Sequence, residues 1–372
     1  MLSSATLRGM PAILLRKKYD RVDMHVLSIV GARPQFVKAA VVSKAMAERG
    51  IRESLVHTGQ HHDSQMSDVF FRELNIPPPT HNLGIHGGGH GDMTGRMLSG
   101  IERIMLDEEP DWVLVYGDTN STLAGALGAA KLHIPLAHVE AGLRSFNRRM
   151  PEEINRVLTD HVSTLLLCPT HAAVINLKSE GIVKGVHMVG DVMMDATIAG
   201  TKIAKAQSNI LQTLGLAEAG YSLATIHRAE NTDNPERLAE VMTYLERRAK
   251  DGRPIVLPLH PRTKGALMKN DIRLSGVRVI DPVGYLDMQR LLSGSVEVFT
   301  DSGGLQKEAY FHRKPCTTLR DETEWLETVQ AGWNRLWKGD GYAPRHEIEE
   351  YGGGNAAARV ATLLAEAAPH SK

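Results

Sequence analysis

Short apolar segments alternate with longer segments of helical period along almost the whole chain from Met24 onward. The apolar segments are rich in β-branched residues, and about 10 to 15 residues of helical period separate them. This alternation is typical of parallel sheets covered by helices, so it predicts an α/β protein with two doubly wound, Rossmann-like halves. The expected strands are 25–30, 53–57, 112–116, 135–139, 165–167 and 187–189, followed by 222–226, 254–257, 277–280, 296–300 and 316–319.

The two series of strands predict the domain boundaries. Between them, a polar helical stretch at 201–212 supplies no strand. Ahead of the first strand, an apolar patch at 10–15 precedes Arg16-Lys17-Lys18, which is the reverse of the order in a signal peptide and too short to cross a bilayer. We therefore expect a disordered extension at 1–23, Rossmann-like domains at 24–192 and 193–352, and a helix at 353–372 that packs back on the first domain.

Composition argues against several partners. The chain has 372 residues, and 43 Lys and Arg balance 43 Asp and Glu. Without net charge it has little attraction for a nucleic acid or a membrane, so we expect neither. Cys168 and Cys316 lie far apart beside apolar runs, which is typical of buried, reduced thiols in a cytoplasmic protein.

Signals for a bound cofactor are weak. The dinucleotide fingerprint G-x-G-x-x-G follows none of the expected strands, which disfavours chemistry on bound NAD. His61-His62-Asp63 and the glycine-rich loop at 86–91 contain metal-ligand residue types, but glycine-rich spacing does not hold ligands rigidly. We expect no metal and no cofactor.

Charged residues follow the strands of the first half. Arg33 and Lys38 flank the start of a helix directly after the first strand, where they can reach an anion. Asp118 and Glu140 each follow a strand, and neighbouring strand ends place both near one cleft. Two plainer interpretations stay open, with Asp118 as a helix N-cap and Glu140 as an ion-pair partner of Arg144.

A third carboxylate opens another helix. Pro151 occupies the first helical position, and Glu152, Asn155 and Arg156 fall on one face of the helix. If Glu152 reaches the same cleft as the two earlier acids, three carboxylates converge there. Such a cluster is suited to general acid and base catalysis.

In the second half, Ser302-Gly303-Gly304 joins an apolar strand to a helix. Two glycines let a phosphate approach the backbone, and the free N–H groups and dipole of the helix attract it. A plain tight turn is the alternative. His227 beside Arg228 also follows a strand and suits a diphosphate, whereas His260 is equally explained as a structural cap.

Together these stretches resemble the non-hydrolysing UDP-N-acetylglucosamine 2-epimerase family across residues 24–368. The resemblance implies a GT-B-like fold, with the active site in the cleft between two domains, a UDP-sugar substrate and a homodimer. The matching motifs are G-x-R-P-x-x-x-K at 31–38, G-D-T at 117–119, H-V-E-A-G-L-R at 138–144, P-E-E-x-N-R at 151–156, H-R at 227–228 and T-D-S-G-G-x-Q at 300–306.

The resemblance also implies roles for single residues. Asp118, Glu140 and Glu152 would handle the proton, and His227 would steady the departing phosphate. Gln60 and His61 match a stretch associated with a second, regulatory UDP-GlcNAc, although the residues after them differ. The residues that would hold the UDP-sugar are Arg33, Lys38, Arg156, His260, Ser302, Gly303, Gly304 and Glu308, with Glu308 on the ribose hydroxyls.

Departures from the usual family pattern indicate the substrate. Thr323-Glu324-Trp325 stands where the family tends to read T-E-R, and Arg148-Arg149-Met150 replaces Ser-Pro-aromatic. These features resemble the subgroup acting on UDP-2,3-diacetamido-2,3-dideoxyglucuronate, in bacterial surface polysaccharide and O-antigen synthesis, and favour it over UDP-GlcNAc. A GT-B glycosyltransferase and a hydrolysing relative remain as alternatives.

Overall fold

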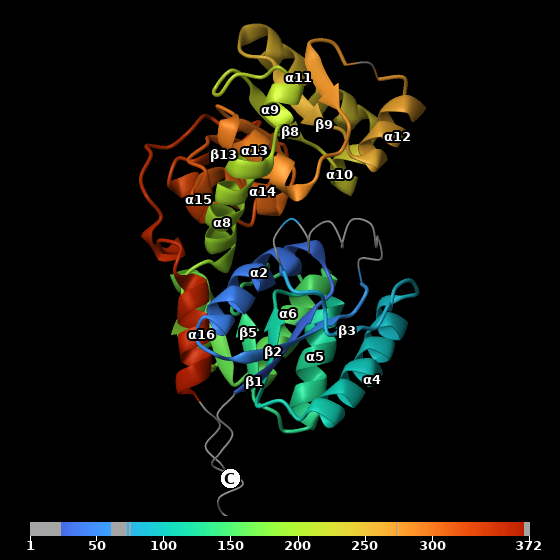
Figure 1. Cartoon of the computed structure of the whole chain (residues 1–372). Coiled ribbons are helices and arrows are strands. Elements are labelled where there is room, and N and C mark those ends of the chain that lie inside the picture. The colour runs from blue at the N-terminus through green and yellow to red at the C-terminus, as the bar shows by residue number, and fades with distance from the viewer. Residues whose placement is uncertain (1–23, 61–72, 74–75, 273, 368–372) are drawn as a thin grey trace, which may run out of the picture.

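The structure, a computed structural model, describes residues 24–60, 73, 76–272 and 274–367. The expected extension at 1–23 lies outside these ranges. Figure 1 shows two α/β bodies, one above the other, each built around its own sheet. In the described parts of the chain, no helix is both long enough and apolar enough to cross a membrane.

The first sheet has seven strands in the order β3-β2-β1-β4-β5-β6-β7, all paired in parallel. Its central strands β1 and β4 are mostly apolar, and they are fully buried because helices cover both faces of the sheet. The strands are β1 (His25–Val30), β2 (Arg52–His57), β3 (His81–Asn82), β4 (Trp112–Tyr116), β5 (Leu136–Val139), β6 (Leu165–Cys168) and β7 (Val186–Met188). The helices are α2 (Arg33–Ala47), α4 (His90–Glu108), α5 (Asn120–Lys131), α6 (Pro151–Val162) and α7 (His171–Ser179).

The second sheet has six parallel strands in the order β10-β9-β8-β11-β12-β13. Its strands are β8 (Ser222–Thr225), β9 (Ile255–Pro258), β10 (Val277–Ile280), β11 (Val298–Thr300), β12 (Cys316–Thr318) and β13 (Asn334–Leu336). Its helices are α9 (Ile210–Thr213), α10 (Ala229–Thr232), α11 (Pro235–Asp251), α12 (Pro261–Lys269), α13 (Tyr285–Gly294), α14 (Gly303–Phe311) and α15 (Leu326–Gln330), with a 3-10 turn at Glu349–Tyr351.

Both sheets reverse their strand order at one point, between β1 and β4 in the first and between β8 and β11 in the second. Open α/β sheets bind ligands at such switch points, beyond the carboxyl ends of the strands. The predicted site residues Arg33 and Asp118 follow β1 and β4, and His227 and Ser302 follow β8 and β11. The topology therefore places the candidate residues where this fold gathers ligands.

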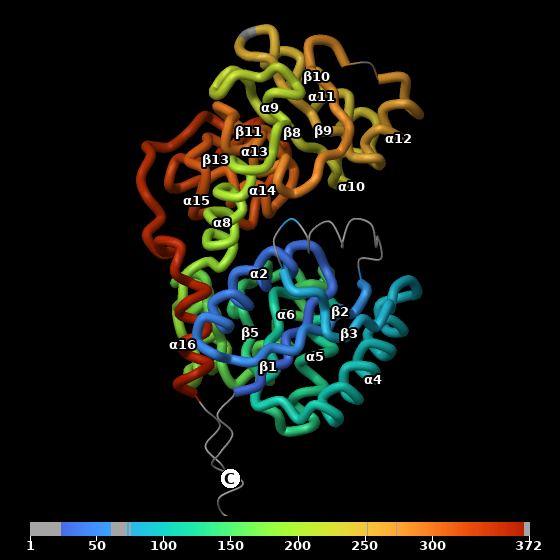
Figure 2. Tube along the Cα trace, viewed as in Figure 1, coloured from blue at the N-terminus to red at the C-terminus, as the bar shows by residue number. Residues whose placement is uncertain are grey.

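The chain crosses between the two bodies twice. The chain passes upward through α8 (Val192–Gln207) and returns to end as α16 (Ala356–Glu366), which packs on α2 (Figure 2). Val360 and Leu364 of α16 are fully buried in the first-sheet core together with Phe36. The final helix of the chain is thus part of the core of the first body.

The predicted two-domain α/β fold is confirmed, and every expected strand is present within a few residues. Two short strands, β3 and β13, were not predicted because they contain only two and three residues and little apolar periodicity. The helix expected at 201–212 was placed too late. It begins as α8 at Val192, because the Asp191 side chain caps the helix by accepting from Met193 N at 2.8 Å.

Candidate active site

The turn after β1 is fastened to the turn after β4 by one buried glutamine. Gln35 Oε1 accepts hydrogen bonds from Gly31 N at 2.7 Å and Ala32 N at 3.0 Å, while its Nε2 donates to Tyr116 O at 2.6 Å. Gly31 has no room for a side chain, since a Cβ there would lie 2.1 Å from Ser121 Oγ. These contacts fix the backbone that carries the predicted anion-binding residues.

Asp118 lies half-buried in the turn after β4 and forms an ion pair with Arg156 of α6. It is not the cap of α5, because Thr119 Oγ1 takes that position and accepts from Thr122 N. Burial raises the pKa of Asp118, and the positive charge of Arg156 opposes that rise. The capping interpretation of Asp118 is therefore wrong.

Glu140 follows β5 with a backbone φ of 73°, a left-handed conformation that few residues other than glycine adopt. Its Oε2 accepts from Lys38, and its Oε1 lies 3.7 Å from Lys307 Nζ of the second body. Burial alone would raise the pKa of Glu140, but the two lysines outweigh burial and lower it to about 2. Glu140 is thus held as a carboxylate.

The proposed pairing of Glu140 with Arg144 is wrong. Arg144 instead donates to Asp160 and to Glu180, each at 2.7 Å. Asp160 also lies 2.7 Å from His138 Nδ1, and the other ring nitrogen, Nε2, donates to Gly117 O at 2.7 Å. This buried network supports the turns that carry Asp118 and Glu140 from behind.

The two glutamates at the start of α6 differ in their surroundings. Glu153 is buried and accepts from Ser145 N at 2.8 Å, Phe146 N at 2.9 Å and Arg156 Nη1 at 2.9 Å. Glu152 is exposed and makes no hydrogen bond or ion pair with any described residue. The structure brings Asp118 and Glu140 close enough for Glu140 to raise the pKa of Asp118, and the role of Glu152 stays a prediction.

In the second body, Ser302 caps α14, and its Oγ accepts from Leu305 N at 3.5 Å. A Cβ on Gly303 would lie 2.3 Å from Glu324 Oε1, so a side chain here would require the Glu324 carboxylate to move. Asp301 is fully buried and accepts from His227 N at 3.0 Å and Arg228 N at 3.0 Å, which joins this turn to the one after β8. The result is a glycine-lined helix N-terminus beside a histidine, as an anion site requires.

His227 and His260 lie side by side, with ring centroids 5.7 Å apart. His260 caps the helix α12 by accepting from Arg262 N at 3.2 Å, and its role toward the substrate stays a prediction. Burial lowers the pKa of His260, and the positive charges of His227 and Arg33 lower it further. Because Arg33 belongs to α2, a guanidinium of the first body lies close enough to affect a histidine of the second body.

Glu308 lies on α14 and accepts from Gln289 Nε2 at 2.5 Å. Burial raises the pKa of Glu308 to about 7. The preceding residue, Lys307, is buried, and its Nζ lies 2.5 Å from Asp191 Oδ2. Sequence reasoning missed Lys307, Asp160 and Glu153, because nothing in a local pattern distinguishes a buried charge from a solvated one.

Other predicted features lie elsewhere. Gln60 Oε1 accepts from Ser121 Oγ at 2.8 Å, whereas His61 and the rest of 61–63 lie outside the described residues.

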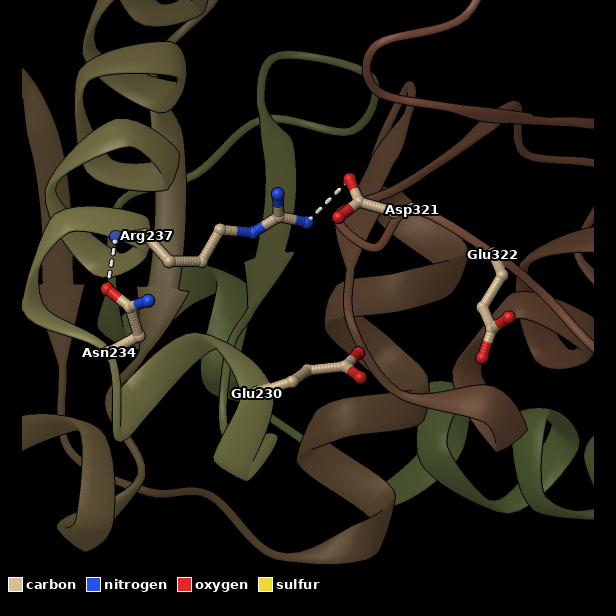
Figure 3. A pocket seen from close by; sticks show the side chains of 5 residues that line it. All are labelled: Glu230, Asn234, Arg237, Asp321 and Glu322. Atoms are coloured by element: carbon tan, nitrogen blue, oxygen red, sulfur yellow. Dashed lines mark hydrogen bonds and ion pairs between the residues drawn. The ribbon is translucent and has the colours of Figure 1, made fainter.

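A cavity of about 490 Å³ in the second body is lined by none of the predicted site residues (Figure 3). It is lined by Glu230, Asn234, Arg237, Asp321 and Glu322.

The fold and the site together define a class of protein. Two Rossmann-like sheets meet with paired carboxylates on one side and a helix N-terminus suited to phosphate on the other. This is the GT-B-like arrangement. A family model described as UDP-N-acetylglucosamine 2-epimerase matches residues 44–365 of the chain.

Comparisons with single proteins agree. A UDP-2,3-diacetamido-2,3-dideoxy-D-glucuronate 2-epimerase of Pseudomonas aeruginosa is 52% identical over 360 residues, which cover 92% of this chain and 100% of that protein. A UDP-N-acetylglucosamine 2-epimerase of Methanocaldococcus jannaschii is 45% identical over 322 residues, covering 84% of this chain and 88% of the relative. The chain belongs to the UDP-N-acetylglucosamine 2-epimerase family.

Solved structures share the fold. The M. jannaschii UDP-GlcNAc 2-epimerase in complex with UDP-GlcNAc and UDP has a TM-score of 0.80 at 41% identity, covering 92% of this chain and 99% of that one. The Neisseria meningitidis UDP-GlcNAc 2-epimerase bound to UDP-GlcNAc has a TM-score of 0.76 at 30% identity, covering 92% of both chains.

Proposed function

We propose that this protein is an epimerase that inverts C2 of a UDP-linked 2-acetamido sugar. The observation that carries the proposal is the contact between the two bodies at the site. Glu140, beside Asp118 at the edge of the first sheet, lies 3.7 Å from Lys307 of α14, the helix that begins at Gly303 in the second body. A sugar bound next to these carboxylates and a diphosphate bound at the N-terminus of α14 could therefore belong to one UDP-sugar molecule.

The chemistry needs both parts of the site. The hydrogen on C2 of a pyranose is not acidic, so a base cannot invert this carbon directly. Breaking the C1–O bond sends its electron pair to the departing UDP and builds positive charge at C1, after which a carboxylate removes the C2 proton and a C1=C2 double bond forms. Adding UDP back to this glycal, with a proton delivered to the other face of C2, gives the epimer.

The residues divide by proposed role. Asp118, Glu140 and Glu152 are proposed to move the proton, and Glu140 is already a carboxylate. His227 is proposed to neutralise charge on the leaving UDP. The UDP-sugar would be held by Arg33, Lys38, Arg156, His260, Ser302, Gly303, Gly304 and Glu308.

The favoured substrate is UDP-2,3-diacetamido-2,3-dideoxyglucuronate. The Pseudomonas aeruginosa relative named for that substrate supports this choice at 52% identity over its whole length. Arg148 and Arg149 are exposed in the loop between β5 and α6, where either could pair with the C6 carboxylate. UDP-GlcNAc is the alternative substrate, and it is the one that the M. jannaschii relative is named for.

The location, oligomeric state and pathway of the enzyme are proposed from its membership of the family. We infer a cytoplasmic homodimer that supplies a UDP-sugar for bacterial surface polysaccharide, including O-antigen. Size-exclusion chromatography with light scattering tests the dimer, and a mass of one chain at working concentration would contradict it.

Proton NMR of the sugar in D2O tests the reaction. The purified protein is incubated separately with UDP-GlcNAc and with the diacetamido uronate, and C2 is followed over time. We expect deuterium at C2 and a mixture of gluco and manno UDP-sugars, with faster turnover of the uronate. Free sugar with stoichiometric UDP would indicate hydrolysis, and no exchange at C2 without an acceptor would favour a glycosyltransferase.

A further inference from the structure

Lys307 is a buried cation that joins the two bodies of the protein. Its side chain is 3% exposed, and its Nζ lies 2.5 Å from Asp191 Oδ2 and 3.7 Å from Glu140 Oε1. Burial alone would lower the pKa of Lys307, but Asp191 and Glu140 outweigh burial and raise it, so the amine is charged. The ring of Trp325 lies 4.1 Å from Nζ and closes off one side of the amine.

The two oxygens of Glu140 are held from opposite sides. Oε2 accepts from Lys38 of the first body, while Oε1 faces Lys307 of the second. Lys307 lies about one turn, or roughly 6 Å, along α14 from the glycine that opens this helix. A rigid helix therefore links the proposed phosphate site to the proposed base.

A purely structural ion pair would need only Asp191. The contact of Lys307 with Glu140 is additional, and Glu140 is the residue with the left-handed backbone at the edge of the first sheet. Charge near Glu140 comes from every side of the site. The groups that act on its charge are Lys38 of α2, Lys307 of α14, Arg156 of α6 and Asp118 of the turn after β4, and Lys307 is itself influenced by Asp191 and Glu327.

We propose that Lys307 is a positioning residue for the epimerisation. It links α14, the helix proposed to bind the diphosphate, to the orientation and charge of Glu140. This inference rests on the proposed function. Lys307 Nζ lies 3.7 Å from Glu140 Oε1, so the proposed effect of Lys307 passes through that carboxylate. Its loss changes the chemical step more than it changes the binding of UDP-sugar.

Lys307→Met tests the coupling, because it removes the charge and keeps most of the length of the side chain. We expect kcat for C2 exchange to fall by about 10- to 100-fold, with KM within about twofold of wild type. The acid limb of the kcat/KM profile should move to higher pH, by about one unit, because a lost cation makes the Glu140 carboxylate easier to protonate. Lys307→Arg keeps the charge and should leave the acid limb in place.

Asp191→Asn is the matched control. It also breaks the pair between Lys307 and Asp191, but it leaves the cation beside Glu140. We expect the thermal stability of Asp191→Asn to fall as much as that of Lys307→Met. Its kcat should stay at least about tenfold higher than that of Lys307→Met, and the acid limb of its kcat/KM profile should not move to higher pH. Lys338→Met, at an exposed lysine 3.0 Å from Glu240, serves as a surface control.

Equal kcat losses in Lys307→Met and Asp191→Asn, or an unmoved acid limb in Lys307→Met, would overturn the inference. Those outcomes leave the proposed function standing as long as wild type exchanges C2. Absence of exchange in wild type would instead remove the proposed function itself.

Discussion

At the scale of single residues, the two acids of the site have opposite electrostatic surroundings. Two lysines hold Glu140 as a carboxylate, whereas burial raises the pKa of Asp118, which among the described residues forms an ion pair with Arg156 alone. Acids whose pKa values are pushed apart can divide the roles of proton acceptor and proton donor. The surroundings therefore suit a reaction that removes a proton from one face and returns it to the other.

Asp118→Asn and Glu140→Gln should each abolish C2 exchange and leave the affinity for UDP nearly unchanged, because both changes preserve shape and remove only the titrating group. We expect losses of at least about 1,000-fold in exchange, read by NMR, with UDP affinity read by calorimetry. Normal turnover by either variant would show that its assigned role is wrong.

The buried pair of His138 and Asp160 predicts a dependence of stability on pH. Burial would raise the pKa of Asp160, but His138 and Arg144 outweigh it and lower the pKa in the folded state. The ionised carboxylate therefore stabilises the fold above about pH 4, the unfolded value, and this stabilisation is lost as the pH falls through the folded pKa. Asp160→Asn should lower Tm at pH 7, and the difference from wild type should shrink toward pH 3, as followed by circular dichroism.

At the scale of elements, α14 combines the phosphate site with Glu308, whose pKa burial raises to about 7. A raised folded pKa means that stability is fully present below the unfolded value and is lost as the pH rises through about 7. Glu308→Gln should remove this loss, so its Tm should change less than that of wild type between about pH 5 and 8. Calorimetry without nucleotide measures this, with the exposed variant Glu366→Gln as control, and identical slopes for wild type and Glu308→Gln would contradict it.

Elements with long apolar patterns could be predicted from the sequence, and short or polar ones could not. The strand at His25–Val30 was predicted with its observed bounds because both its faces are covered and its residues are mostly apolar. The strand at Asn334–Leu336 was missed because its pairing with β12, not the pattern of its own three residues, makes it a strand. Among the candidate site residues, those in turns after strands could be named from the sequence, whereas Lys307 could not, since its partners lie far away in the sequence.

At the scale of the whole molecule, the chain leaves the first body through α8 and returns to complete its core with α16. Leu364→Ala should lower the free energy of unfolding by about 2–5 kcal/mol, because this side chain is fully buried against the first sheet. Ile175→Ala, at a residue that is 65% exposed, should change it by less than about 0.5 kcal/mol. Urea unfolding measures both, and equal effects would show that α16 is not part of that core.

The central claim is that a nucleotide is released and recaptured between the two bodies, with the acids of one facing the phosphate site of the other. A crystal structure with UDP bound tests this claim most directly. We expect the diphosphate at the backbone N–H groups of 302–304, beside His227, with Asp118 and Glu140 facing the position of the sugar. UDP bound far from Ser302, or both carboxylates turned away from the sugar position, would contradict the account.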